Sequence, residues 1–310
     1  MDSNLLHKPV LVNEVLEGFK SHFSNQKDFC VLDGTFGRGG HFEALRQNFA
    51  DKMTYIGLDQ DLEAVEFAKQ NYSDAIQNNK LQIHHTNFSD FENINKILKN
   101  LSANKKPNAV FLDLGVSSPQ LDDPRRGFSF YNSGPLDMRM NQKIEKTAAD
   151  VLNQESLEDL REIFLDYGEV YAPQRLLNAI EEDRAKKPFS ETTEFSGLIE
   201  RVCGWRKKGS HPATLYFQAL RLFVNKELES LDEALKRYQE ILAPGGLFVV
   251  ITFHSLEDRR VKFSFRDSVL GKPINKKVIK PKDDELKENK RARSAKLRFF
   301  KKGEENHEEQ

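Results

Sequence analysis

The stretch VLDGTFGRGGHFEAL, which runs from Val31 to Leu45, decides the fold of this chain. It begins with apolar residues and an acid, passes four glycines and ends on a sequence typical of the start of a helix. A glycine-rich turn between a strand and a helix lets the backbone approach a ligand closely, because glycine has no Cβ. The stretch therefore predicts a strand-turn-helix unit with a ligand at the turn.

Short apolar runs elsewhere in the chain are typical of buried strands. Helical periodicity separates several of them, for example at DLEAVEFAKQNY (61–72) and FENINKILKNL (91–101). Strands that alternate with helices indicate βαβ units and a parallel sheet, so we expect the α/β class. The predicted strands cover residues 29–33, 54–59, 81–88, 108–115 and 246–253.

The alternation stops after Gly115 and resumes only at LAPGG (242–246), a gap far longer than one crossover connection needs. Residues 117–140 are rich in turn formers. Helical patterns follow, and the longest covers residues 212–242. These patterns predict a helical segment inserted into the α/β domain.

The predicted insert covers residues 125–210, and we interpret it as a substrate-recognition domain. The α/β domain is then discontinuous and consists of residues 1–124 and 211–310. The tail from about residue 271 is charged and poor in apolar residues, which predicts partial disorder.

The overall composition restricts the class of protein. The chain has 47 basic and 48 acidic residues, so nucleic-acid binding would require local basic patches. Cys30 and Cys203 are too far apart for a zinc cluster or a disulfide framework and fit a reducing compartment. We read no signal peptide, and the longest apolar run, GLFVVITF, is too short to span a membrane. We therefore expect a cytoplasmic protein with no membrane partner.

The glycine turn discriminates between nucleotide ligands. The dinucleotide fingerprint G-x-G-x-x-G does not fit, because Phe42 stands where the third glycine is required. The pattern D-x-G-x-G-x-G, usual in S-adenosylmethionine (AdoMet) sites, fits Asp33, Gly37 and Gly39, but Thr35 takes the first glycine position. LAPGG before an apolar strand is also common in AdoMet-dependent methyltransferases. A role of the glycines in packing alone stays open.

Polar side chains follow the predicted strands at their carboxyl ends, where open α/β sheets bind their ligands. Asp59 could accept both hydroxyls of a ribose, which AdoMet and NAD share. Phe88 could stack on an adenine or lie in the core. The polar residues after the fourth strand are Asp113, Ser117, Ser118 and Gln120.

The string SSP (117–119) partly matches a short motif, Ser, Asp or Asn followed by proline, of enzymes that methylate an exocyclic amine of a base. The amine must become pyramidal before it attacks a methyl group. Acceptors aimed at its N–H groups favour that change, and proline fixes the loop that presents them. An ordinary Ser-Pro turn is the alternative interpretation.

The chain contains longer blocks in a fixed order: HKPVLVNEVL (7–16), DGTFGRGGH (33–41), LDLGVSSPQLD (112–122), GPLDMRM (134–140), FHSLEDR (253–259) and RARSAKLR (291–298). Together they closely resemble the bacterial 16S rRNA cytosine-N4 methyltransferase family (RsmH, formerly MraW). The resemblance extends from about residue 7 to residue 300.

This resemblance implies a Rossmann-like class I AdoMet-dependent methyltransferase domain with a helical insert. It implies methylation of a cytidine N4 amine in the decoding region of 16S rRNA of the small ribosomal subunit. Two departures affect only expectations about RNA contact: GEVY (168–171) replaces the usual GEER, and Lys290 replaces the usual proline before RARS. The AdoMet contacts that the resemblance implies are Gly39, Gly40, His41, Asp59, Phe88, Asp113 and Gln120.

Methyl transfer to an amine by in-line displacement needs no metal and depends on positioning and on acceptors for the amine protons. Our candidate acceptors are Ser117, Ser118 and Asp137. His254 follows a strand and could line the same cleft or make only a structural hydrogen bond.

Three clusters of basic and aromatic residues are candidates for binding an RNA whose target base is flipped out or unstacked. Each could instead be a solvated face, and phosphate contact is favoured for the last two. The clusters are Arg125, Arg126, Phe128 and Phe130; Arg201, Trp205, Arg206, Lys207, Lys208 and His211; and Lys290, Arg291, Arg293, Lys296 and Arg298.

Other functions stay open at this point. A NAD-dependent dehydrogenase shares the turn and the ribose acid but is disfavoured by Phe42 and LAPGG. A DNA or other RNA amino-methyltransferase and a non-catalytic RNA-binding protein are further alternatives. The sequence does not decide between free RNA and the assembled subunit as substrate, or between a monomer and a homodimer.

Overall fold

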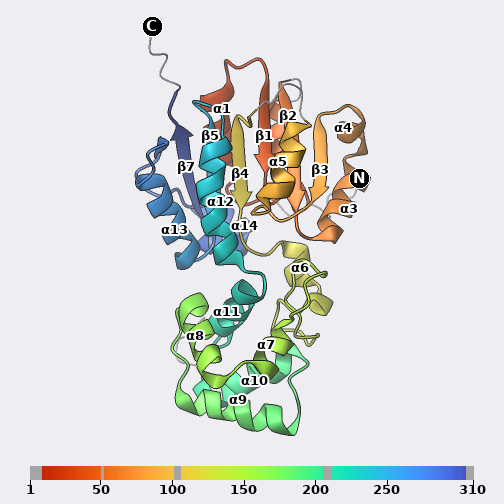
Figure 1. The fold of residues 1–310 in the computed structure, drawn as a ribbon, viewed down its shortest axis with the longest axis vertical. Helices are drawn as coiled ribbons and strands as arrows, with labels where there is room; N and C mark the ends of the chain where they lie inside the picture. Colours follow the sequence, from red (N-terminus) through yellow and green to blue (C-terminus); the bar gives the residue numbers. More distant parts are fainter. Residues whose placement is uncertain (1–8, 50–51, 101–105, 205–210, 305–310) are drawn as a thin grey trace. The chain divides into compact units, whose positions relative to one another are not determined.

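The computed structural model describes residues 9–49, 52–100, 106–204 and 211–304. The chain divides into two compact units (Figure 1): one is formed by Met1–Gly115 with Ser230–Gln310, and the other by Val116–Glu229. The second unit extends beyond the predicted insert on both sides. Val116 and Leu121 pack against the helical core, which explains why the loop after the fourth strand belongs to that unit.

The first unit contains a seven-stranded sheet with the order β3-β2-β1-β4-β5-β7-β6. The first five strands of that order pair in parallel, whereas β7 pairs antiparallel with both β5 and β6. All the predicted strands are present, which confirms the α/β class and the parallel sheet. The strands are β1 (Phe29–Asp33), β2 (Met53–Asp59), β3 (Leu81–His85), β4 (Ala109–Asp113), β5 (Leu247–Thr252), β6 (Gly271–Pro273) and β7 (Lys296–Lys302).

The last two strands lie in the tail for which we predicted partial disorder. The described tail residues up to residue 304 are ordered in these strands, whereas residues 305–310 lie outside the described residues, so partial disorder of the tail stays a prediction. Leu297 and Phe300 of β7 are fully buried, and Phe299 is nearly so. The few apolar residues of the tail are concentrated in one short strand, and the average composition of the tail hides this concentration.

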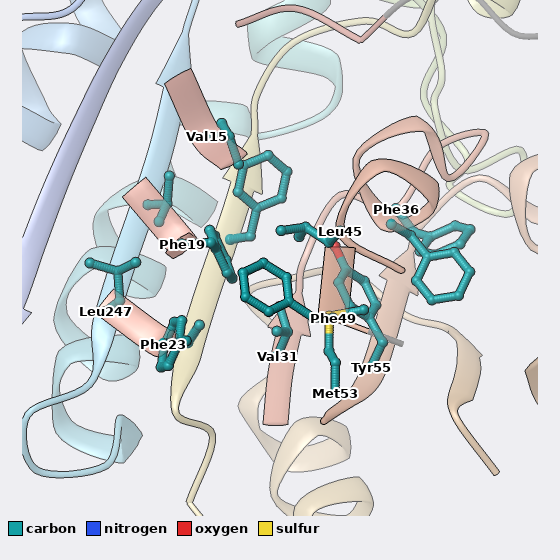
Figure 2. Close-up of a cluster of buried hydrophobic side chains, with 14 of the residues drawn as sticks. Val15, Phe19, Phe23, Val31, Phe36, Leu45, Phe49, Met53, Tyr55 and Leu247 are labelled. Atoms are coloured by element: carbon teal, nitrogen blue, oxygen red, sulfur yellow. The ribbon is translucent and has the colours of Figure 1, made fainter. Parts of the chain in front are cut away.

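Helices cover both faces of the sheet. One apolar cluster joins α1, α2 and α3 to the sheet, and Figure 2 shows Phe19 and Phe23 of α1 in this cluster with Val31 of β1. The cluster on the other face joins α5, α12 and α13 to side chains such as Leu32. Consecutive residues of β1 thus point to opposite faces, and both faces are apolar. The helices of this unit are α1 (Val12–Phe23), α2 (Gly40–Phe49), α3 (Leu62–Asn71), α4 (Ser73–Gln77), α5 (Phe91–Lys99), α13 (Ser255–Arg266), α14 (Asp283–Glu288) and the 3-10 helix η3 (Lys290–Ser294).

The second unit is helical and has a core of its own. Phe164, Phe195 and Phe217 form successive ring stacks in that core. Among the described residues of the whole chain, no helix is long and apolar enough to cross a membrane. The helices of this unit are α6 (Ser118–Asp122), the 3-10 helix η2 (Pro124–Arg126), α7 (Ala148–Gln154), α8 (Leu157–Gly168), α9 (Gln174–Lys186), α10 (Thr192–Cys203) and α11 (Thr214–Val224).

The long helix predicted over residues 212–242 is broken in the structure. It consists of α11 and α12 (Glu227–Ile241), and Lys226 between them has a left-handed φ of 50°. The Asn225 side chain donates a hydrogen bond to the Met138 carbonyl (2.8 Å) and accepts one from the Met140 N–H (2.7 Å). The break therefore serves a tertiary contact, which helical periodicity does not reveal.

Candidate functional site

The glycine turn is organised from inside by Asp33, which ends β1 and is 2% exposed. Its Oδ1 accepts a hydrogen bond from the Thr35 N–H (2.9 Å), and its Oδ2 accepts one from the Tyr55 hydroxyl (2.7 Å). Burial raises the pKa of Asp33 to about 6, although both hydrogen bonds oppose this shift. Asp33 thus fixes the turn, and no local pattern in the sequence predicts Tyr55 as its partner.

Thr35, the departure from the glycine pattern, connects two strands. Its Oγ1 accepts a hydrogen bond from the main-chain N–H of Asp113 (2.6 Å), the last residue of β4, and lies 3.4 Å from Asp33 Oδ1. A hydroxyl in the first glycine position therefore holds the end of β4 to the end of β1. The glycine pattern identifies Thr35 as an exception, but it does not predict the hydrogen bond that Thr35 accepts from the Asp113 N–H.

Asp59 holds the turn from the neighbouring strand β2. Its Oδ2 accepts a hydrogen bond from the Gly37 N–H (2.8 Å) and its Oδ1 accepts one from the Asp61 N–H (2.8 Å). Gly37 has a φ of 55°, a conformation that favours glycine. A carboxylate has about four lone-pair sites, so Asp59 retains acceptor capacity for a ligand. Burial raises the pKa of Asp59 to about 7.

Gly39 is required by packing inside the unit. Its φ is 74°, and a Cβ at this position would lie 2.6 Å from the Tyr72 ring and 2.8 Å from the Phe36 ring. Gly40 is the first residue of α2, and a Cβ there would lie 3.3 Å from Pro9. The packing role that the sequence left open is therefore present at Gly39, whatever the turn binds.

His41 and Asp113 form a polar pair that is incompletely satisfied. His41 is 6% exposed, and its ring lies 4.7 Å from that of Phe111. His41 Nε2 is 3.6 Å from Asp113 Oδ2. Within the described residues, neither ring nitrogen of His41 nor the buried Oδ1 of Asp113 has a hydrogen-bond partner. Buried polar atoms without partners are unfavourable, so this pair fits a ligand that brings polar atoms of its own.

Phe88 lies mainly in the core of the first unit. It is 8% exposed and belongs to the apolar cluster on the α5 and α12 face. Its carbonyl accepts a hydrogen bond from the Tyr238 hydroxyl (2.7 Å), and a Cβ on Gly34 would lie 2.7 Å from its own Cβ. The geometry supports the core interpretation of Phe88, whereas stacking on an adenine stays a prediction.

The other polar candidates belong to the second unit. Ser117 and Gln120 form the capping box of α6: Gln120 Oε1 accepts from the Ser117 N–H (3.0 Å), and Ser117 Oγ accepts from the Gln120 N–H (3.4 Å). The Ser118 hydroxyl makes no hydrogen bond with any residue that the structure describes. Asp137 binds Arg139 through both carboxylate oxygens at 2.8 Å. Of the three predicted amine acceptors, Asp137 is thus already paired with a cation.

His254 is the N-cap of α13 in the first unit. Its Nδ1 accepts a hydrogen bond from the Glu257 N–H (3.4 Å), and its Nε2 lies 3.0 Å from Glu257 Oε1. The other carboxylate oxygen of Glu257 accepts from the Phe253 N–H (2.8 Å). The cap through Nδ1 supports the structural role, whereas the buried Nε2 has no hydrogen-bond partner among the described residues.

Several predicted RNA contacts have structural partners instead. The buried Arg126 donates to the carbonyls of Arg139 (3.1 Å) and Met140 (3.0 Å). Lys296 and Arg298 both bind Asp258, at 3.1 and 2.8 Å. These three cations therefore have partners within the protein, and their contact with RNA phosphates stays a prediction.

The remaining described members of the clusters differ in burial: Phe128 lies in the helical core, whereas the cations Arg125, Arg201, Lys290, Arg291 and Arg293 are exposed. Arg125 is exposed and binds Asp123 (2.7 Å). His211 pairs with Glu200 (2.7 Å), and its ring lies 4.5 Å from that of Phe130. In the departing GEVY segment, Glu169 has a left-handed φ of 49° and ends α8. Trp205, Arg206, Lys207 and Lys208 lie outside the described residues.

Comparison with known proteins identifies the family. Residues 4–303 match the model of the MraW methylase family. A ribosomal RNA small subunit methyltransferase H from Bdellovibrio bacteriovorus is 49% identical over 295 residues, which cover 95% of this chain and 87% of that protein. Its namesake from Coxiella burnetii is 41% identical over 313 residues, with coverage of 96% and 98%. A solved rRNA methylase from Streptococcus thermophilus shares 8% identity at a TM-score of 0.44, with coverage of 97% of this chain and 100% of that one. The chain therefore belongs to the MraW methylase family.

Proposed function

We propose that this protein methylates the N4 amine of a cytidine in the decoding region of 16S rRNA, with AdoMet as the methyl donor. The observation that carries the proposal is the buried pair His41 and Asp113, whose polar atoms lack partners among the described residues and lie at the carboxyl ends of the strands. The names of the relatives support RNA of the small ribosomal subunit as the substrate.

The residues of the glycine turn would hold the cofactor. AdoMet, when bound, supplies a methyl group on a positively charged sulfur. Asp59 has acceptor capacity for the ribose hydroxyls, since each of its oxygens uses one lone pair on a main-chain N–H. His41 and Asp113 would contact the polar atoms of the amino-acid part, while the N-terminus of α2 at Gly40 favours a carboxylate.

Two further predicted contacts are already used inside the protein. Phe88 is packed in the core, and Gln120 completes the cap of α6. In this proposal the polar contacts to the cofactor fall to His41, Asp59 and Asp113, and contact of Phe88 and Gln120 with the cofactor stays a prediction of the resemblance.

Ser117 and Ser118 are our candidate acceptors for the amine protons. The cytosine nitrogen forms a bond to the methyl carbon as the bond from carbon to sulfur breaks, and the amine then loses a proton. Ser118 has a hydroxyl without a partner among the described residues, and Ser117 has a second lone pair. Asp137 would act on the substrate only through Arg139, with which it is paired.

Nucleoside mass spectrometry of small-subunit RNA from cells that lack the protein tests this proposal. We expect one N4-methylcytidine to disappear, to return with the wild-type gene, and not to return with Asp113→Asn, which keeps the size of the side chain but removes its charge. Purified protein given labelled AdoMet with free 16S rRNA, assembled subunits or DNA identifies the acceptor. Labelling of DNA alone, or full rescue by Asp113→Asn, contradicts the proposal.

A further inference from the structure

The segment from β6 to the end of β7 concentrates positive charge. Residues 271–302 contain thirteen lysines and arginines and four acidic residues, whereas the whole chain has 47 basic and 48 acidic residues. Like charges close together repel one another, so an ordered segment of this kind needs other contacts to fix it.

Uncharged contacts hold the segment against the sheet. The Asn275 side chain accepts a hydrogen bond from the Phe299 N–H (2.8 Å) and donates one to the Leu297 carbonyl (3.2 Å). Ile279 and Leu297 exchange two main-chain hydrogen bonds of 3.1 and 2.9 Å. The conformation of the segment therefore does not depend on most of its cations.

The thirteen cations differ in their partners, and four of them, Lys282, Lys287, Arg291 and Lys301, have acidic or other partners near the surface. Lys296 and Arg298 bind Asp258, and Lys302 donates to the last carbonyls of α12, so these three stabilise the fold. Six others are exposed and form no ion pair with a residue that the structure describes. Five of them, which we name the crossover cations, are Lys276, Lys277, Lys280, Lys290 and Arg293; the sixth, Lys272, lies opposite Lys301 at the other end of β7.

The segment leads to the edge of the sheet that carries the glycine turn. In the antiparallel pairing of β5 and β7, Lys296 lies opposite Thr252, the last residue of β5. The helix η3, which contains Lys290 and Arg293, directly precedes Lys296. Since the parallel strands all end at this edge, η3 enters the sheet where β1, β2 and β4 carry the candidate cofactor residues.

A second connection places the segment near the same turn. The side chain of Glu285 in α14 accepts a hydrogen bond from the Leu11 N–H (2.7 Å), and Lys282 lies 3.6 Å from Glu14. The chain just before Leu11 is in contact with the turn, since a Cβ on Gly40 would touch Pro9. The crossover is thus fixed beside the elements that hold the glycine turn.

We propose that the crossover cations form a surface that binds RNA phosphates and holds the substrate backbone beside the methyl-transfer site. Residues 271–295 contain no aromatic residue, so the surface offers no stacking and reads charge but not base sequence. Lysine suits this task as a mobile point charge for phosphate. The inference rests on the proposed function for the identity of the RNA.

The test replaces three of the lysines and measures RNA binding against salt concentration. The variant is Lys276→Gln, Lys277→Gln and Lys280→Gln in the full chain, and the probe is 16S rRNA. The matched control is Lys20→Gln, Lys69→Gln and Lys236→Gln, three exposed helical lysines outside the segment. We expect the slope of log K against log salt to fall by about 2, because each phosphate contact contributes about 0.7–0.9. AdoMet affinity should equal that of the wild type.

The outcomes separate this inference from the proposed function. If the salt slope and the RNA affinity of the Lys276, Lys277 and Lys280 variant equal those of the control variant, the proposed phosphate-binding surface is refuted. This holds even if the wild type methylates small-subunit RNA. A wild type that methylates no small-subunit RNA refutes the proposed function, while the binding measurement still decides the surface. Loss of binding to phosphatidylserine vesicles with RNA binding unchanged would also overturn it, because the surface would then serve a membrane.

Discussion

Replacing Thr35 with valine tests how the end of β4 is held. Valine has nearly the same shape as threonine but lacks the hydroxyl oxygen that accepts the Asp113 N–H at 2.6 Å. The substitution leaves that main-chain donor without its partner and removes the contact with Asp33 Oδ1 at 3.4 Å. The glycine turn and the rest of the core are not otherwise changed.

The expected loss of stability follows from the burial of that hydrogen bond. A buried donor left unpaired costs about 1–3 kcal/mol, and Thr35 is half-buried, so we expect the lower part of that range, about 1–2 kcal/mol. Asp113 is also a candidate cofactor contact, and a shift of its carboxylate should weaken AdoMet binding by about tenfold, equivalent to about 1.4 kcal/mol.

Urea unfolding and calorimetric titration with AdoMet measure the two effects. Thr35→Ser is the matched control, since it keeps the hydroxyl and loses only the methyl group, and it should behave nearly as the wild type in both assays. Wild-type stability and affinity in Thr35→Val would refute the reasoning. Equal losses in the serine and valine variants would show that the methyl group, not the hydrogen bond, matters.

Three further substitutions test the turn and its surroundings. Gly39→Ala should lower the free energy of unfolding by about 2–4 kcal/mol, because the new Cβ would lie 2.6 Å from Tyr72 at a φ of 74°. A loss of less than about 1 kcal/mol, measured by urea unfolding, would contradict this expectation. Asp59, with a pKa of about 7, lowers the stability as the pH rises to about 7; the folded state also keeps a proton on Asp33 up to about pH 6, whereas the unfolded chain releases it near pH 4, so Asp33 should contribute a further fall of about 3 kcal/mol between pH 4 and pH 6. Asp33→Asn should remove this fall, and an identical pH profile of urea unfolding in both proteins would disprove the assignment. His254→Asn should keep the cap of α13 and a methyl-transfer rate within about twofold of wild type, since asparagine is a good N-cap; a rate about 100-fold lower at unchanged AdoMet affinity would instead indicate proton transfer.

The predicted strands and the position of the candidate site could be derived from local patterns. Apolar runs such as those of β1 and β4 are buried on both faces, so they are recognisable without knowledge of their neighbours. Parallel pairing then brings the carboxyl ends of the strands to one edge. Asp33, Asp59 and Asp113 are expected together for this reason alone.

Other features depend on partners that are distant in the sequence. The bond from Asp113 to Thr35 joins residues 78 positions apart, and the bond from Met140 to Asn225 joins residues 85 apart. The second of these ends α11 and breaks a helix that periodicity extends without interruption. The average composition of the tail likewise does not predict the strand β7, because β7 is stabilised by pairing with β5 and β6.

Short contiguous patterns in the sequence were enough to predict the α/β class, the parallel sheet and the glycine turn with its acids. The resemblance to one methyltransferase family rests on such patterns too. Only the tertiary structure decided which of the named side chains are free. Asp137, Lys296 and Arg298 are held in ion pairs, whereas His41 and Asp113 keep polar atoms without partners among the described residues. The physical reason is that the availability of a polar group depends on what the fold places within hydrogen-bond distance of it, and local sequence does not specify those neighbours.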